Sequence, residues 1–363
     1  MMKATELLHN LGQSIWLDNI TRELLDRGTL KQYIDEFSLT GLTSNPTIFN
    51  YAIKGSKAYD AAIRKRSADG QSGEALFCEL ALEDLTRAAD QFRPIYDRTN
   101  GVDGWVSVEV SPLLAYDTAR TLAAARDLYF HAGRPNVLIK IPGTKEGLPA
   151  IEEAIFSGIP INVTLLFSRE QYLAAAEAFL RGIERRMEAR LKPAVGSVAS
   201  VFISRWDAAI KGKVPHKLEH ELGIAMAMRT YKAARDLLSS PRWQRIYNAG
   251  AFPQRLLWAS TGTKDPTLSD VLYVKSLVAP FTVNTMPETT LKALAAQTEV
   301  ESILPADGGD CEDILSQISA AGVDVNGLAA QLQNDGARMF VHSWKELMSV
   351  IDSKTDKFHK LAS

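Results

Sequence analysis

The sequence predicts an α/β protein built as a single (β/α)8 TIM barrel, a closed ring of eight parallel strands, with additional helices. Strand-like segments alternate with helix-sized segments eight times along the chain. The 363 residues, 46% of them hydrophobic, can bury one large core. Polar side chains also interrupt the later parts of several apolar strands, where active sites lie in such barrels.

The predicted strands are short apolar segments that end at Gly, Pro or polar residues. The third shows the alternation most clearly, because Val106, Val108 and Val110 alternate with Ser107 and Glu109. The eight segments cover residues 14–20, 41–47, 105–110, 137–141, 161–166, 195–203, 256–260 and 277–285.

Helix-sized segments separate these strands. Ser168 and Gln171 form a capping box that predicts the start of one helix after the fifth strand. An N-terminal helix is expected over residues 2–12, an extended helical segment over about 207–253, and C-terminal helices over about 288–363. We therefore expect residues 1–363 to form one barrel domain.

Composition and charge limit the classes of function. A formal net charge of −2 gives no reason to expect a nucleic-acid or membrane partner. Cys78 and Cys311 imply no disulfide framework, which fits a reducing compartment. The chain has no apolar run of membrane-spanning length and no signal-peptide pattern at its start. A cytoplasmic protein is expected.

Lys140 lies inside the apolar strand Val137–Ile141, which Pro142 and Gly143 end. Burial favours the free amine form of a lysine, and a free amine can form a Schiff base with a carbonyl compound. A single buried lysine more often extends to solvent or pairs with a carboxylate. Its partners on other strands therefore decide between these interpretations.

Several predicted strands carry a polar residue where buried parallel strands are normally apolar. On most of them the alternate positions are Ile, Val or Leu, so the polar positions are expected to face the barrel axis. If these polar residues served only to pack the core, they would need many hydrogen bonds and would bring no advantage over apolar residues. It suits the handling of a carbonyl compound with several hydroxyl groups. The set is Asp18, Asn45, Glu109, Lys140, Asn162, Thr164 and Ser200.

At these residues the chain resembles the transaldolase family. The resemblance covers about residues 14–290 and is carried by the motifs Thr43–Thr47, Val137–Thr144 with Gly147, and Asn162–Ser168. Asp18-Asn19 and the segment Ala259–Lys264 resemble the longer bacterial branch. The resemblance implies a class I aldolase barrel, a transferase of the pentose phosphate pathway that needs neither a metal nor an organic cofactor.

The resemblance also implies residue roles. Lys140 would be the Schiff-base lysine, Asp18 the acid/base at the C4 hydroxyl, and Glu109 a proton carrier. Thr164 would hold the water through which Glu109 acts. Phe202 lies on the inward face beside Ser200, where an apolar side chain would keep water from the enamine. The implied substrate-binding residues are Thr43, Asn45, Asn162, Ser200 and Phe202, with Arg205 and Lys264 for phosphate.

The expected reaction transfers dihydroxyacetone from sedoheptulose 7-phosphate to glyceraldehyde 3-phosphate and gives erythrose 4-phosphate and fructose 6-phosphate. The expected partners are sugar phosphates, and the protein is expected to be a monomer or a homodimer. One alternative is an aldolase that releases dihydroxyacetone from fructose 6-phosphate. Another is an inactive barrel kept for binding, but Lys140, Asp18 and Glu109 are all present.

The segment His216–His220 fits the H-x-x-E-H pattern of a zinc peptidase group. Such a short pattern arises often by chance, and no third ligand follows in a matching context. We interpret it as a solvated helix face and expect no metal site.

Overall fold

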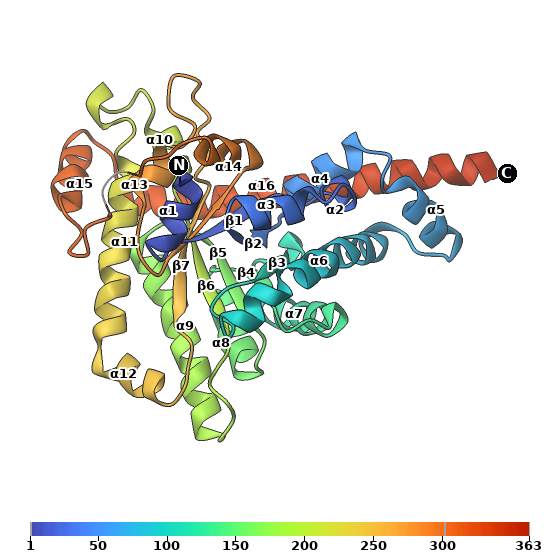
Figure 1. Cartoon of the computed structure of the whole chain (residues 1–363), viewed down its shortest axis with the longest axis horizontal. Helices are drawn as coiled ribbons and strands as arrows, with labels where there is room; N and C mark the ends of the chain where they lie inside the picture. The colour runs from blue at the N-terminus through green and yellow to red at the C-terminus, as the bar shows by residue number, and fades with distance from the viewer. Residues whose placement is uncertain (1, 301–302, 363) are drawn as a thin grey trace.

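A computed structural model of the chain describes residues 2–300 and 303–362. Within these residues eight parallel strands form a closed barrel in sequence order, and β8 pairs with β1 (Figure 1). The predicted (β/α)8 barrel is therefore confirmed. The strands are β1 (Ser14–Asp18), β2 (Leu39–Thr43), β3 (Val106–Glu109), β4 (Val137–Pro142), β5 (Ile161–Leu166), β6 (Ser197–Phe202), β7 (Gln254–Ala259) and β8 (Val283–Met286).

Helices surround the barrel and connect its strands (Figure 1). The helices before β4 are α1 (Ala4–Asn10), α2 (Arg22–Asp26), α3 (Thr29–Glu36), α4 (Pro46–Gly55), α5 (Asp60–Ala68), α6 (Gly73–Arg98), η1 (Pro112–Leu114) and α7 (Thr118–Ala132). Those after β4 are α8 (Gly147–Phe156), α9 (Arg169–Glu188), α10 (Ser204–Ile210), η2 (His216–Leu218), α11 (Leu222–Ser239), α12 (Pro241–Asn248), α13 (Leu272–Ser276), α14 (Glu288–Ala295), α15 (Cys311–Ala320) and α16 (Val325–Ala362).

The sequence patterns explain where several of these elements begin. Ser168 is the N-cap of α9, and the capping box with Gln171 is present as predicted. The apolar stripe of α9 is buried against the barrel and its neighbours, since Tyr172, Phe179 and Ile183 are almost inaccessible. The side chains between the strands and the helices thus form one continuous core.

The predicted second strand runs too far. β2 ends at Thr43, and Asn45 is the N-cap of α4, where its Oδ1 accepts a hydrogen bond from the Ile48 amide. Pro46 occupies the first helical position, where a missing N–H costs nothing. The Asn-Pro pair therefore starts a helix, and Asn45 reaches the barrel mouth from a helix cap.

The predicted eighth strand begins too early. α13 ends at Ser276, and β8 does not start until Val283. Pro280 cannot donate to a strand ladder that is paired on both sides, and Phe281 has a φ of 65°. Residues before Thr282 consequently form a turn and not a strand.

Two other local expectations are wrong. The stretch from His216 to His220 is a short 3-10 helix and a turn, so the two histidines do not share an α-helical face. The alternation of β5 is broken at Leu165, which has a φ of 58° beside a register shift in the β5–β6 pairing. Its side chain lies close to Gly336 of α16.

α16 is the element that the sequence patterns place least well. This 38-residue helix packs against α4, α5, α6 and η1 and contacts β5. Its first half lies over the barrel, and its C-terminal part extends away from it alongside α4 and α5 (Figure 1). Across residues 2–300 and 303–362, we find no helix that combines the length and the apolar character needed to span a bilayer.

Candidate active site

A cavity of about 320 Å³ opens at the carboxyl ends of the strands, where (β/α)8 barrels hold their active sites. Of the predicted site residues, Glu109 and Asn162 lie outside its lining. The others line it: Asp18, Thr43, Asn45, Lys140, Thr164, Ser200, Phe202, Arg205 and Lys264.

Lys140 stands at the base of this cavity on β4. It is 5% exposed, and its Nζ donates to Glu109 Oε2 at 3.2 Å and to the Ser44 carbonyl oxygen at 3.1 Å. The pairing of β3 with β4 sets this contact, because Glu109 and Lys140 are direct partners in the register. The amine and the carboxylate are therefore held together by the sheet itself.

The two carboxyl groups occupy different surroundings. The Glu109 side chain is 4% exposed, and burial raises its pKa, although the Lys140 charge opposes this. Burial also raises the pKa of Asp18, which is opposed by Lys140, by a 2.7 Å hydrogen bond from Thr43 Oγ1 and by Arg205. Burial thus favours the protonated form of each carboxyl group, and Lys140 opposes it in both cases.

Asn162 lies beneath the cavity floor and is fully buried. Its Oδ1 accepts a hydrogen bond from Ser200 Oγ at 2.7 Å, and its Nδ2 donates to Ser107 Oγ at 3.0 Å. In this structure its side chain therefore positions the Ser200 hydroxyl, which does line the cavity.

Two buried oxygens near Lys140 have no hydrogen-bond partner among the described residues: Thr164 Oγ1 and Glu109 Oε1. Buried polar atoms in native proteins are normally bonded to protein or to ordered water. Each of these two oxygens therefore has an unused capacity to accept a hydrogen bond.

Two cations approach the cavity from its other side. Arg205 is on α10, directly after β6, and Lys264 lies in the loop after β7. In the described part of the chain neither has a carboxylate within ion-pair distance. Arg205 packs over the Phe202 ring, with its Cζ 5.0 Å from the ring centroid. Unpaired cations at the mouth of a barrel suit an anionic group such as phosphate.

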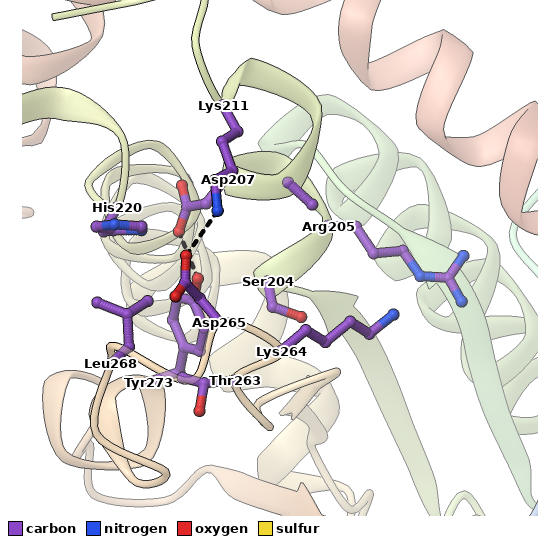
Figure 2. Close-up of a pocket in the computed structure, with 11 residues that line it drawn as sticks. Ser204, Arg205, Asp207, Lys211, His220, Thr263, Lys264, Asp265, Leu268 and Tyr273 are labelled. Atoms are coloured by element: carbon purple, nitrogen blue, oxygen red, sulfur yellow. Dashed lines mark hydrogen bonds and ion pairs between the residues drawn. The ribbon is translucent and has the colours of Figure 1, made fainter. Parts of the chain in front are cut away.

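Arg205 and Lys264 also border a neighbouring cavity of about 150 Å³ (Figure 2). There Lys211 Nζ is 2.7 Å from Asp265 Oδ2, so this cation is already paired. Figure 2 shows the Arg205 and Lys264 side chains extending to the same side, away from that pair. Both unpaired cations also line the main cavity.

Asp207, in the same neighbouring cavity, is a buried carboxyl group that the sequence patterns do not single out. It accepts hydrogen bonds from the Gly223 amide and from Tyr273 Oη at 2.8 Å. Burial raises its pKa to about 7, against the effect of these bonds. Through these hydrogen bonds the Asp207 side chain, on α10, connects α10 to α11 and α13.

Eight further residues line the main cavity but were not predicted as site residues: Thr47, Ile48, Tyr51, Ala259, Ser260, Thr285, Met339 and Phe340. Phe340 is 5% exposed, and its ring centroid lies 5.7 Å from Lys140 Nζ and 5.9 Å from Arg205 Cζ. No local pattern marks Phe340, because it belongs to an amphipathic helix whose apolar residues all look alike in sequence.

Two residues hold α16 in this place. Gln333 Nε2 donates to the carbonyl oxygens of Gly143 and Leu165, each at 3.0 Å, at the ends of β4 and β5. Gly336 permits the close approach, because a Cβ there would lie 2.8 Å from Leu165 Cδ2 and 3.2 Å from an Arg205 guanidinium nitrogen. α16 is therefore part of the cavity wall.

The chain is similar to known proteins over nearly its whole length. Residues 15–351 match the family model described as Transaldolase/Fructose-6-phosphate aldolase. The chain is 42% identical over 361 residues to the transaldolase of Arthrobacter sp. (strain FB24), covering 97% of both chains. It is 43% identical over 358 residues to the transaldolase of Thermobifida fusca (strain YX), covering 96% of this chain and 97% of that protein.

Proposed function

The chain belongs to the transaldolase/fructose-6-phosphate aldolase family, and we propose that its reaction proceeds through a Schiff base on Lys140. Its activity is that of a transaldolase, a transferase of the pentose phosphate pathway, and its substrates are sugar phosphates. We also propose the individual sugar phosphates, the covalent intermediate and the residues that form it. Dihydroxyacetone would pass from sedoheptulose 7-phosphate to glyceraldehyde 3-phosphate, giving erythrose 4-phosphate and fructose 6-phosphate.

The Lys140–Glu109 pair is the observation that supports this proposal most strongly. Transfer of one proton across the 3.2 Å contact turns the ammonium and carboxylate into a free amine and a carboxylic acid. The raised pKa of Glu109 favours this transfer. The amine then attacks C2 of the ketose phosphate to form a carbinolamine.

Dehydration of the carbinolamine needs a proton on the departing hydroxyl group. Glu109 holds the proton taken from Lys140 and returns it, directly or through a water bonded to Thr164 Oγ1. Thr164 Oγ1, which has no partner among the described residues and belongs to a residue of the cavity lining, supports the position of that water. Water leaves, and a protonated imine on Lys140 remains.

Asp18 is the proposed base for carbon–carbon cleavage. It takes the proton of the C4 hydroxyl, the C3–C4 electron pair moves into the imine, and the shortened aldose phosphate leaves. An enamine of dihydroxyacetone stays on Lys140. C3 of the enamine then attacks the acceptor aldehyde, and Asp18 gives its proton to the new hydroxyl. Thr43, which donates to Asp18 at 2.7 Å, holds the carboxylate in place.

The remaining lining residues would bind the substrate. Asn45 Oδ1 is used by the Ile48 amide, which leaves its Nδ2 to donate to a substrate hydroxyl. Ser200 is positioned by Asn162 for the same purpose. The unpaired Arg205 and Lys264 would bind the phosphate. Phe202, whose ring is tilted against that of Phe167 with 5.4 Å between the centroids, presents an apolar surface that would exclude water from the enamine.

Incubation with fructose 6-phosphate and sodium borohydride, followed by peptide mass spectrometry, tests the proposal. A reduced dihydroxyacetone adduct on Lys140 is expected. Lys140→Arg should give no adduct, whereas Lys264→Gln should keep it and raise KM. An adduct on a different lysine would refute the proposed site.

The family also contains fructose-6-phosphate aldolases, which are distinguished by their products. Erythrose 4-phosphate given as acceptor together with fructose 6-phosphate should yield sedoheptulose 7-phosphate and little free dihydroxyacetone. Equal release of dihydroxyacetone with and without an acceptor would assign the aldolase activity instead.

A further inference from the structure

A second cavity of about 120 Å³ lies behind Glu109, between α4, α6, α7 and α16. Asn45 lines both this cavity and the active-site cavity, and the Glu109 side chain lines this one. We call it the rear cavity. We propose that it binds a small organic cation with an apolar body, such as an aryl- or alkylamine.

Aromatic and aliphatic side chains form most of its wall. Phe77 contacts Phe49 edge-on at 5.3 Å and Trp344 edge-on at 5.2 Å, and Val108 and Leu128 also line the space. An apolar cavity of about 150 Å³ is known to hold benzene. The rear cavity therefore has the size and the surface for one small ring or a short alkyl chain.

The charged residues that line the rear cavity are all acidic. They are Glu74, Glu109 and Asp127, and no lysine, arginine or histidine of the described chain joins them in the lining. A cation is consequently preferred over a neutral molecule of the same shape, and an anion is disfavoured.

Glu74 and Asp127 are exposed residues of the lining, on α6 and α7, and Cys78 lines the same cavity. Both carboxylates are close enough to act on the Cys78 thiol: burial first, and then these two charges, raise the pKa of Cys78 to about 12. Arg120 interacts with Glu74, and His131 Nδ1 lies 3.3 Å from an Asp127 oxygen, but neither residue lines the cavity.

Two residues of the lining each carry a buried oxygen without a hydrogen-bond partner in the described part of the chain: Ser111 Oγ and Glu109 Oε1. Ser111 is 8% exposed, and the Glu109 side chain is 4% exposed. An ammonium group has three N–H donors and no acceptor, so it complements acceptors of this kind. The buried acceptors and the exposed acidic residues of the lining thus favour the same class of ligand.

The rear cavity is also connected to the catalytic pair. Glu109 Oε2 accepts from Lys140, and Glu109 is also a lining residue of the rear cavity. A bound cation would compete with Lys140 for the carboxylate without occupying the substrate cavity. We expect it to lower kcat with little change in KM. Cation binding in the rear cavity does not require that Lys140 forms a Schiff base.

Benzylamine is a suitable probe, and benzyl alcohol is its uncharged counterpart. Binding is measured by isothermal titration calorimetry with the full chain, in saturating fructose 6-phosphate and also in Lys140→Ala. We expect one saturable benzylamine site under both conditions and binding of benzyl alcohol at least tenfold weaker. Glu74→Gln/Asp127→Asn should weaken benzylamine binding at least tenfold, whereas Asp97→Asn, on α6 outside the cavity, should not change it.

Filling the space gives an independent test. Ala124, half-buried on α7, lines the cavity, so Ala124→Phe should abolish benzylamine binding while the variant still binds fructose 6-phosphate. Competition between benzylamine and fructose 6-phosphate would place the probe in the active site and overturn the proposal. Equal binding of benzyl alcohol, or unchanged binding in the double variant or in Ala124→Phe, would also overturn it.

Discussion

Phe340 lies over Lys140, with 5.7 Å between its ring centroid and Nζ, although the two residues belong to the last helix and the fourth strand. The same ring is 5.9 Å from Arg205 Cζ. One aromatic side chain thus covers both the amine proposed to form the Schiff base and a cation proposed to bind phosphate. α16 therefore closes the site that the barrel strands build.

Phe340→Ala should lower kcat/KM about tenfold, because loss of the ring admits water beside Lys140 and frees Arg205. Loss of a buried aromatic ring should also cost about 3 kcal/mol of unfolding free energy. Kinetics and thermal unfolding measure both effects. Met339→Ala is the matched control, since Met339 is 51% exposed and should change stability little. A wild-type kcat/KM in Phe340→Ala would show that the ring has no role in the reaction.

Asp18→Asn should separate Schiff-base formation from carbon–carbon cleavage. The borohydride adduct of Lys140 should still form but retain the whole six-carbon fructose 6-phosphate skeleton, because the base for the C4 hydroxyl is missing. A kcat loss of about 10²–10⁴-fold is expected. Mass spectrometry distinguishes the whole-substrate adduct from the dihydroxyacetone adduct. Accumulation of the three-carbon adduct would assign the cleavage step to another base.

The pH dependence of kcat/KM should report Glu109. Burial raises its pKa, and Glu109 must be ionised to accept the proton of Lys140. Activity should therefore fall as the pH decreases through this raised pKa, above the range of an ordinary carboxyl group. Glu109→Gln should lose that acidic limb and slow Schiff-base formation about 100-fold. An unchanged acidic limb in the variant would exclude Glu109 as the group responsible.

Asp207 should make stability depend on pH. Its pKa is raised to about 7, whereas an unfolded aspartate titrates near about 3.9. Between these values the folded protein keeps a proton that the unfolded chain has lost, so the free energy of unfolding falls as the pH rises. The contribution is on the order of 4 kcal/mol.

Asp207→Asn removes this titration but can still hydrogen-bond Gly223 and Tyr273. Relative to the parent protein, the variant should gain stability between pH 5 and pH 8, measured by denaturant unfolding at each pH. Asp265→Asn, at the exposed ion pair with Lys211, is the control and should show no such gain. A constant difference across this range would contradict the prediction.

Much of the fold was predictable because the signals are local. The alternation in β3 and the apolar run of β4 depend on a two-residue period, which places Glu109 and Lys140 on the inner face. The boundaries were less predictable where a residue fits two structures. Asn45-Pro46 ends a strand or starts a helix equally well, and only the hydrogen bond to Ile48 decides for the helix.

The same division holds for the site. The sequence by itself indicated the residues that we propose to carry the chemistry and, through strand order and parity, predicted that they meet at the carboxyl ends of the strands. The tertiary structure alone decided that Asn162 lies beneath Ser200 and that Glu109 borders a second cavity. It also decided that Gln333 and Gly336 bring Phe340 over Lys140. Local periodicity fixes the face on which a residue lies, whereas a contact between distant segments depends on how whole elements pack, which no short stretch of sequence encodes.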